Sequence, residues 1–160
     1  MIVMLNGAFG AGKTTLAQEL LRRNPDWMLF DPEEVGLLLW RIGPEPRGDF
    51  QNLPAWAPLV VETARVLWAT HRRTMVIPMT LTDERNYRTI RKGFEGIVET
   101  QHFTLLADPS TLEARLLERG DEPGSWAFQQ IERCRVLAEP QFARHLDALK
   151  SVQQLAEEIA

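Results

Sequence analysis

The chain has 160 residues, of which 44% are hydrophobic and 25% charged, and its formal net charge is −4. This length and composition are typical of one globular domain and argue against a disordered chain. The negative charge argues against a nucleic-acid partner, because such proteins usually carry a basic patch. No apolar run approaches the roughly 20 residues that span a bilayer. The single cysteine, Cys134, fits a reducing cytosol and a packing role. We therefore expect one cytoplasmic domain spanning residues 1–160.

The N-terminal part of the chain alternates between apolar runs and helical patterns. Residues 2–5 are continuously apolar, which predicts a short strand buried on both faces of a parallel sheet. A glycine-rich loop follows, and apolar spacing predicts a helix over about residues 13–23. Residues 27–30, WMLF, predict a second strand. The DPEE sequence after it, residues 31–34, is typical of a helix start.

The middle of the chain begins with a loop rich in proline and glycine, residues 43–54. The clearest helical pattern follows over residues 56–71. Residues 74–79, TMVIPM, predict a third strand, with Pro78 expected at its end because proline cannot donate to a sheet ladder. A polar helix is predicted around residues 83–92.

The remaining pattern again alternates, and it predicts a strand at 102–107, a helix from Asp108, a break at 119–126, a helix near 127–138, a strand near 146–149 and a helix from Ser151. Strands alternating with helices predict an α/β three-layer sandwich with a mainly parallel, five-stranded sheet. Ligands bind such sheets at the carboxyl ends of the strands. The glycine-rich loop and Asp31 both fall there.

The glycine-rich loop has the sequence GAFGAGKT, residues 7–14, and matches the phosphate-loop pattern G-x-x-x-x-G-K-[ST]. Glycines let backbone N–H groups curl around an oxyanion, and the helix N-terminus adds partial positive charge. A plain glycine turn is the alternative, but the strand before the loop and the helix after it favour a nucleoside triphosphate site. We expect the nucleotide to contact Gly7, Ala8, Phe9, Gly10, Ala11, Gly12, Lys13, Thr14 and Thr15, with Lys13 on the β- and γ-phosphates and the Thr14 hydroxyl on Mg²⁺.

Two absences in the sequence indicate which class of phosphate-loop protein this is. The third predicted strand carries no acidic residue at its end, where motor-like and switch NTPases have one. The guanine-reading sequence N-K-x-D is also missing. Together with the short chain, these absences favour a kinase that acts on a small molecule, and they leave ATP and GTP both open.

Asp31 is the candidate that would act on the acceptor. It ends the second predicted strand, where small phosphate-loop kinases commonly place a carboxylate that orients the acceptor hydroxyl or accepts its proton. The alternative is a helix N-cap, which the DPEE sequence supports equally well.

Two arginines precede a break in the sequence that resembles the lid of adenylate-kinase-like enzymes. In this interpretation residues 119–126 form the lid, Arg115 stacks on the base, and Arg119 reaches the γ-phosphate. Arg133 would join from the far side, at the substrate. The alternative is a solvated helical face on which the arginines pair with nearby glutamates.

The acceptor pocket is expected on the loop over residues 43–56 and at the ends of the second and third strands. Trp56 lies on the apolar stripe of its helix, but it also sits at the mouth of this polar loop, where it can flank a substrate. The candidate substrate contacts are Asp31, Asp49, Gln51, Trp56, Thr80 and Arg133.

Several phrases occur in order along nearly the whole chain: NGAFGAGKT, FDPEEVG, DFQNLPAW, VIPMTL, HFTLLA, SWAFQQIERC and SVQQLAEEIA. In these phrases the chain resembles the tunicamycin-resistance ATP-binding proteins. The resemblance implies an ATP-binding protein of kinase-like fold that protects bacteria against tunicamycin, a uridine-containing, fatty-acylated nucleoside. The family's phosphate loop maps to residues 7–14 and its acidic position to Asp31. Family members continue beyond the AEEIA equivalent with a segment that contacts membrane, whereas this sequence stops at Ala160, so peripheral membrane contact stays open.

The sequence therefore supports two main hypotheses. The first is an ATP- and Mg²⁺-dependent phosphotransferase acting on a hydroxyl of tunicamycin or a related uridine nucleoside, with Lys13 and Arg119 neutralising charge and Asp31 orienting the acceptor. The second is ATP-dependent sequestration of the antibiotic without transfer. A housekeeping nucleoside or nucleotide kinase is a third alternative. The oligomeric state stays open.

Overall fold

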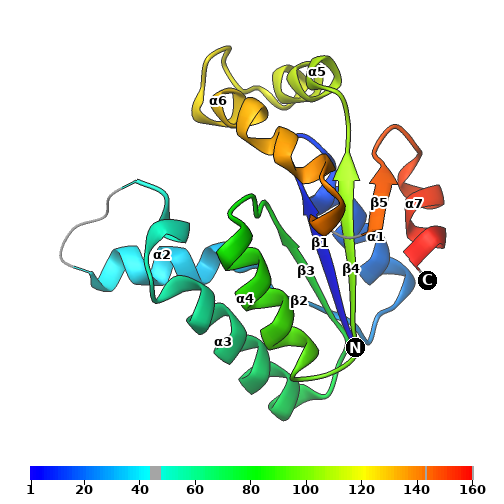
Figure 1. Ribbon diagram of the computed structural model, residues 1–160. Coiled ribbons are helices and arrows are strands. Elements are labelled where there is room, and N and C mark those ends of the chain that lie inside the picture. Colours follow the sequence, from blue (N-terminus) through cyan, green and yellow to red (C-terminus); the bar gives the residue numbers. More distant parts are fainter. Residues whose placement is uncertain (44–47, 143, 160) are drawn as a thin grey trace.

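The computed structural model describes residues 1–43, 48–142 and 144–159. Five parallel strands form one sheet in the order β2-β3-β1-β4-β5 (Figure 1). The strands are β1 (Ile2–Gly7), β2 (Met28–Leu29), β3 (Met75–Met79), β4 (Thr100–Leu106) and β5 (Arg144–Asp147). The helices are α1 (Lys13–Arg23), α2 (Glu33–Ile42), α3 (Trp56–His71), α4 (Glu84–Glu95), α5 (Pro109–Arg119), α6 (Trp126–Arg133) and α7 (Val152–Ile159).

The helices cover both faces of the sheet. Helices α3 and α4 pack together on one face, and α1 and α7 pack together on the other, while α5 and α6 lie beyond the carboxyl ends of the strands (Figure 1). This arrangement confirms the α/β three-layer sandwich that the alternating pattern predicts.

Strand β1 is the centre of the sheet, and all six of its residues are buried. It pairs with β3 on one side and with β4 on the other, so that Leu5 lies opposite both Pro78 and Phe103. A strand buried on both faces needs a continuous apolar run rather than alternation, which is what residues 2–5 provide.

Pro78 lies within β3 next to its last residue, and the sheet accommodates it for a geometric reason. The carbonyl of Val76 accepts the Phe30 N–H at 3.0 Å, so the backbone groups of Val76 face the β2 edge. Pro78 has the same parity and also faces that edge, but β2 pairs only with Met75 and Val76. Because no β2 residue pairs with Pro78, the N–H that proline lacks would have no ladder hydrogen bond to make.

Several predicted boundaries differ from the structure, most clearly those of β2, α6 and β5. Strand β2 has two residues rather than the four of WMLF, and α6 ends at Arg133, where the chain tightens into a 3₁₀ helix over Cys134–Ala138. Strand β5 starts at Arg144, two residues before the predicted Leu146. The prediction missed this start because only Leu146 of the strand is buried and the exposed positions beside it are polar. An apolar run is a poor guide to an edge strand with one buried side chain.

Two further sequence expectations concern the loop at 43–56 and membranes. Residues 44–47 of that loop lie outside the described residues, and the part after them contains a 3₁₀ turn over Phe50–Asn52. Among the helices of the described residues, none combines the length and apolar character that a membrane crossing requires.

The packing of α3 on α4 gives a test of the fold. A Cβ on Gly93 would lie 2.5 Å from both Cγ atoms of Val61, whereas a Cβ on Gly96 would meet backbone oxygens only at 3.4 Å. Overpacking of this kind costs about 1–3 kcal/mol, which exceeds the ~1 kcal/mol of helix propensity that alanine adds. We expect Gly93→Ala to lower the free energy of unfolding and the control Gly96→Ala to leave it nearly unchanged. Urea denaturation measures both, and equal stabilities would contradict this packing.

Candidate active site

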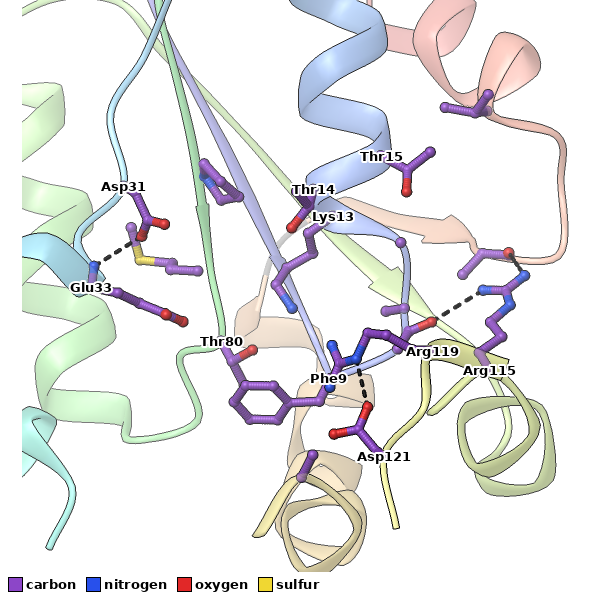
Figure 2. A pocket seen from close by; sticks show the side chains of 18 of the residues that line it. Phe9, Lys13, Thr14, Thr15, Asp31, Glu33, Thr80, Arg115, Arg119 and Asp121 are labelled. Atoms are coloured by element: carbon purple, nitrogen blue, oxygen red, sulfur yellow. Dashed lines mark hydrogen bonds and ion pairs between the residues drawn. The ribbon is translucent and has the colours of Figure 1, made fainter. Parts of the chain in front are cut away.

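A cleft of about 880 Å³ opens at the carboxyl ends of the strands. Figure 2 shows Lys13 in its middle, with Asp31 and Glu33 on one side and Arg115 and Arg119 on the other. The lining residues come from the phosphate loop and α1, from the ends of β2 and β3, and from the region between α5 and α7: Phe9–Thr15, Asp31, Glu33, Pro78–Thr80, Arg115, Arg119, Asp121, Ser125–Ala127, Ala148, Lys150, Val152 and Leu155.

The phosphate loop has the backbone geometry that glycine allows. Gly10 and Gly12 have φ angles of 82° and 94°, in the left-handed region where side chains bring strain. Helix α1 begins directly after Gly12, so its N-terminus faces the cleft. This arrangement forms an anion cradle, because free N–H groups and the helix dipole both favour negative charge.

Asn6 and Thr80 fix this loop to β3. The buried Asn6 side chain donates to the Leu81 carbonyl at 3.0 Å and accepts the Leu81 N–H at 2.9 Å and the Gly7 N–H at 2.8 Å. The Thr80 hydroxyl donates to the Gly7 carbonyl at 2.9 Å. Thr80, a predicted acceptor contact, thus lines the cleft and also bonds to the loop.

The Lys13 ammonium folds back onto its own loop. Its Nζ donates to the carbonyls of Gly7 and Ala8, both at 2.9 Å. Burial lowers the pKa of Lys13 to about 8, partly countered by the nearby Cys134, Glu33 and Asp31. A phosphate oxyanion entering the cleft would replace these neutral carbonyls with a charged partner.

Asp31 and Glu33 form one wall of the cleft, called the acidic wall below. The Asp31 Oδ1 accepts the Glu33 N–H at 2.9 Å, so Asp31 serves as a helix-start acceptor and also faces the cleft. The capping and functional interpretations of Asp31 are therefore compatible. Burial, followed by the charge of Asp31, raises the pKa of Glu33. Our sequence reasoning missed Glu33, although its place two residues after Asp31 was a usable signal.

The two arginines of α5 contact different parts of the cleft. Arg119 Nε donates to Asp121 Oδ2 at 2.6 Å, and both residues line the cleft (Figure 2). Arg115 donates to the Ala148 carbonyl at 2.7 Å and to the Gly10 carbonyl at 3.5 Å. Arg115 therefore joins the phosphate loop to the turn after β5. Among the residues that the structure describes, neither arginine pairs with the helical glutamate that the alternative interpretation expects.

The structure draws three of the predicted substrate contacts into an internal network. Arg133 pairs with Asp49 Oδ2 at 3.2 Å, and Asp49 Oδ1 accepts the Gln51 N–H at 2.9 Å. The Gln51 side chain donates to the Thr80 carbonyl at 2.8 Å. Asp49, Gln51 and Arg133 are not among the residues that line the cleft.

Trp56 requires a correction. We predicted it as a residue that flanks the substrate, but it is 1% exposed and its Nε1 donates to the Pro32 carbonyl at 3.1 Å. The apolar stripe of α3 turns it inward, and its polar atom finds a partner at the start of α2. Trp56 thus supports the backbone next to Asp31 from within the core.

Trp126 is a cleft residue that sequence reasoning missed. It begins α6, at the end of the predicted lid, and its ring lies 4.9 Å from that of Phe9 in an edge-on geometry. The available signal was its position, since it is the last residue of the predicted lid, 119–126.

The comparisons with known proteins agree with this geometry. A family model described as an AAA domain matches residues 2–140. The solved structure of a Deinococcus radiodurans tunicamycin resistance protein is 32% identical, with a TM-score of 0.84, over 99% of this chain and 92% of that one. The chain belongs to the tunicamycin resistance protein family. This confirms the resemblance seen in the sequence.

More distant structures share the fold of this tunicamycin resistance family member. A sugar kinase from Janibacter sp. HTCC2649 is 19% identical, with a TM-score of 0.72, over 99% of this chain and 91% of that one. An Acinetobacter baumannii shikimate kinase in complex with shikimate is 14% identical, with a TM-score of 0.62, over 99% and 89%. No curated protein matches the chain. The fold is therefore that of the small P-loop kinases, which generally bind a nucleotide with Mg²⁺.

The lowered pKa of Lys13 predicts a pH dependence of nucleotide binding. Phosphate binds the ammonium form, so binding raises the pKa of Lys13 above its value of about 8 in the free protein. The Kd for Mg·ATP should be flat below that pH and then rise by up to about tenfold per pH unit. Calorimetric titration from about pH 7 to pH 9.5 measures this rise.

Lys13→Arg is the control for this pH dependence, because a guanidinium stays charged throughout the range. Its Kd should not change with pH, whatever its absolute value. A wild-type Kd that is equally flat would contradict a phosphate contact by Lys13.

Proposed function

We propose that this protein transfers the γ-phosphoryl group of ATP to a hydroxyl of a small molecule, tunicamycin or a related uridine nucleoside, in the cytoplasm. The observation that carries the proposal is the placement of Lys13 between the acidic wall and Arg119 in one cleft. A protein that only holds a nucleotide needs the phosphate loop. It does not need carboxylates that face the γ-phosphate, or an arginine that can contact the phosphoryl group during transfer. The name of the Deinococcus relative supports tunicamycin as the acceptor.

In the proposed transfer, each step is assigned to a residue of the cleft. The acceptor oxygen attacks the γ-phosphorus, a new O–P bond forms, and the bond from that phosphorus to the β–γ bridging oxygen breaks, releasing ADP. Asp31 orients the acceptor hydroxyl and takes its proton. Lys13 and Arg119 stabilise the negative charge on the phosphoryl oxygens. For Arg119 this means leaving Asp121, with residues 119–126 closing as a lid.

The residues also fit Mg²⁺. Among residues 1–43, 48–142 and 144–159, no three His, Cys, Asp or Glu side chains cluster as a metal site. Thr14, whose side chain faces the cleft in Figure 2, would supply one ligand, and the nucleotide phosphates would supply others. When bound, Mg²⁺ offsets phosphate charge.

Asp31→Asn tests the proposal because asparagine is also a good helix-start residue. The backbone hydrogen bond to Glu33 can persist while the proton acceptor is lost. We expect kcat for ADP release with tunicamycin to fall by at least about 100-fold. The Kd for Mg·ATP should stay within about twofold.

Glu34→Gln is the matched control, since Glu34 is exposed on the same helix turn but does not line the cleft. Its turnover should equal that of the wild type. Unchanged turnover in Asp31→Asn would remove the catalytic role of Asp31. ATP-dependent binding of tunicamycin without ADP release in the wild type would favour sequestration.

A further inference from the structure

Trp126 is unusual among the large apolar side chains of this protein. It is 53% exposed, yet it lines the cleft rather than an outer surface. A tryptophan that leaves more than half of its surface in water inside a cleft retains a large apolar area for a ligand to cover. Leu117 on α5 is similarly exposed, at 50%, but lies outside the cleft lining.

The orientation of Trp126 is set by Phe9. The two rings meet edge-on at an interplanar angle of 68°. Phe9 also contacts Lys13, whose ammonium lies 5.5 Å from the centre of the Phe9 ring. Trp126 is thus one aromatic ring away from the ammonium that would hold the γ-phosphate. Because Phe9 belongs to the phosphate loop, the indole is tied to the reacting end of the cleft.

The chemistry of the cleft around Trp126 differs from that at its other end. Val152, Leu155 and Arg115 line the end beside α7, which suits the base of the nucleotide. Asp31 and Glu33 carry their charges near Lys13, and the indole lines the same cleft in contact with the Phe9 ring. Carboxylates accept hydrogen bonds from hydroxyl groups, and an aromatic face stacks on a flat ring.

We propose that Trp126 is the stacking platform for the acceptor, a molecule that presents an apolar ring face together with hydroxyl groups. In a nucleoside the base supplies the face and the ribose supplies the hydroxyls, and in a pyranose sugar one ring supplies both. The inference rests on the proposed function for the assignment of this side of the cleft to the acceptor. Trp126 holds the ring face while the acidic wall holds its hydroxyls, which positions one hydroxyl beside the phosphate.

The experiment measures binding of the acceptor to the protein saturated with Mg²⁺ and a non-hydrolysable ATP analogue. Uridine, N-acetylglucosamine and tunicamycin are titrated separately by calorimetry, which distinguishes a nucleobase from a pyranose as the stacked ring. The variants are Trp126→Ala, Trp126→Phe and the control Leu117→Ala. Thermal unfolding of each variant confirms that it is folded.

We expect Trp126→Ala to raise the Kd of the ring acceptor by about tenfold, as loss of one aromatic stack does, while Trp126→Phe stays within about threefold. The Kd of the ATP analogue should be the same in all variants, and Leu117→Ala should match the wild type. An unchanged acceptor Kd in Trp126→Ala would overturn the inference. So would an equal loss of ATP-analogue binding, because Trp126 would then serve the nucleotide or the lid.

The failure of this inference and the failure of the proposed function are distinguishable. If the wild type binds a ring acceptor through Trp126 but transfers no phosphoryl group, the proposed function fails and the platform stands. If transfer occurs and Trp126→Ala leaves the acceptor Kd and KM unchanged, only the platform fails.

Discussion

The hydrogen bonds that the Gly7 carbonyl accepts hold the site together. The Lys13 ammonium and the Thr80 hydroxyl both donate to it at 2.9 Å, which joins the end of β1 to the start of α1 and the end of β3. A partly buried ammonium benefits from such partners, because desolvation disfavours its charge. Strand β1 lies between β3 and β4, and pairing on both sides fixes where the phosphate loop begins. The Gly7 carbonyl is therefore held where Lys13 and Thr80 can reach it. Phosphate binding then replaces carbonyl contacts that are already in place.

The contacts around the Gly7 carbonyl differ in how firmly they are held. Asn6 and Trp56 are buried and have hydrogen-bond partners, so the phosphate loop and the backbone beside Asp31 are held rigidly. Arg119, by contrast, pairs with Asp121 at the edge of the cleft with its side chain 55% exposed. Exposed ion pairs contribute little stability, so this arginine can exchange one anion for another at low cost. In the proposed function, the rigid part would bind the nucleotide and the loosely held part would respond to it.

The sequence predicted what is encoded locally. The phosphate loop and Asp31 were found because each depends on residues next to one another in the chain, at the end of an apolar run. Trp56 and Gln51 were not placed correctly, because the face that each presents depends on packing against Pro32 and Thr80, which are distant in sequence. Trp126 and Glu33 lie next to the predicted lid and to Asp31, which were usable signals, but only the fold shows that both residues line the cleft. The elements were identified, but the side chains that converge on the cleft became visible only with the fold.

The most direct test is mass spectrometry of tunicamycin after incubation with the purified protein and Mg·ATP. The account predicts a new species heavier by one phosphoryl group, together with ADP, and neither product with Lys13→Ala. Tunicamycin that remains unmodified while it binds to the ATP-loaded protein would contradict phosphoryl transfer.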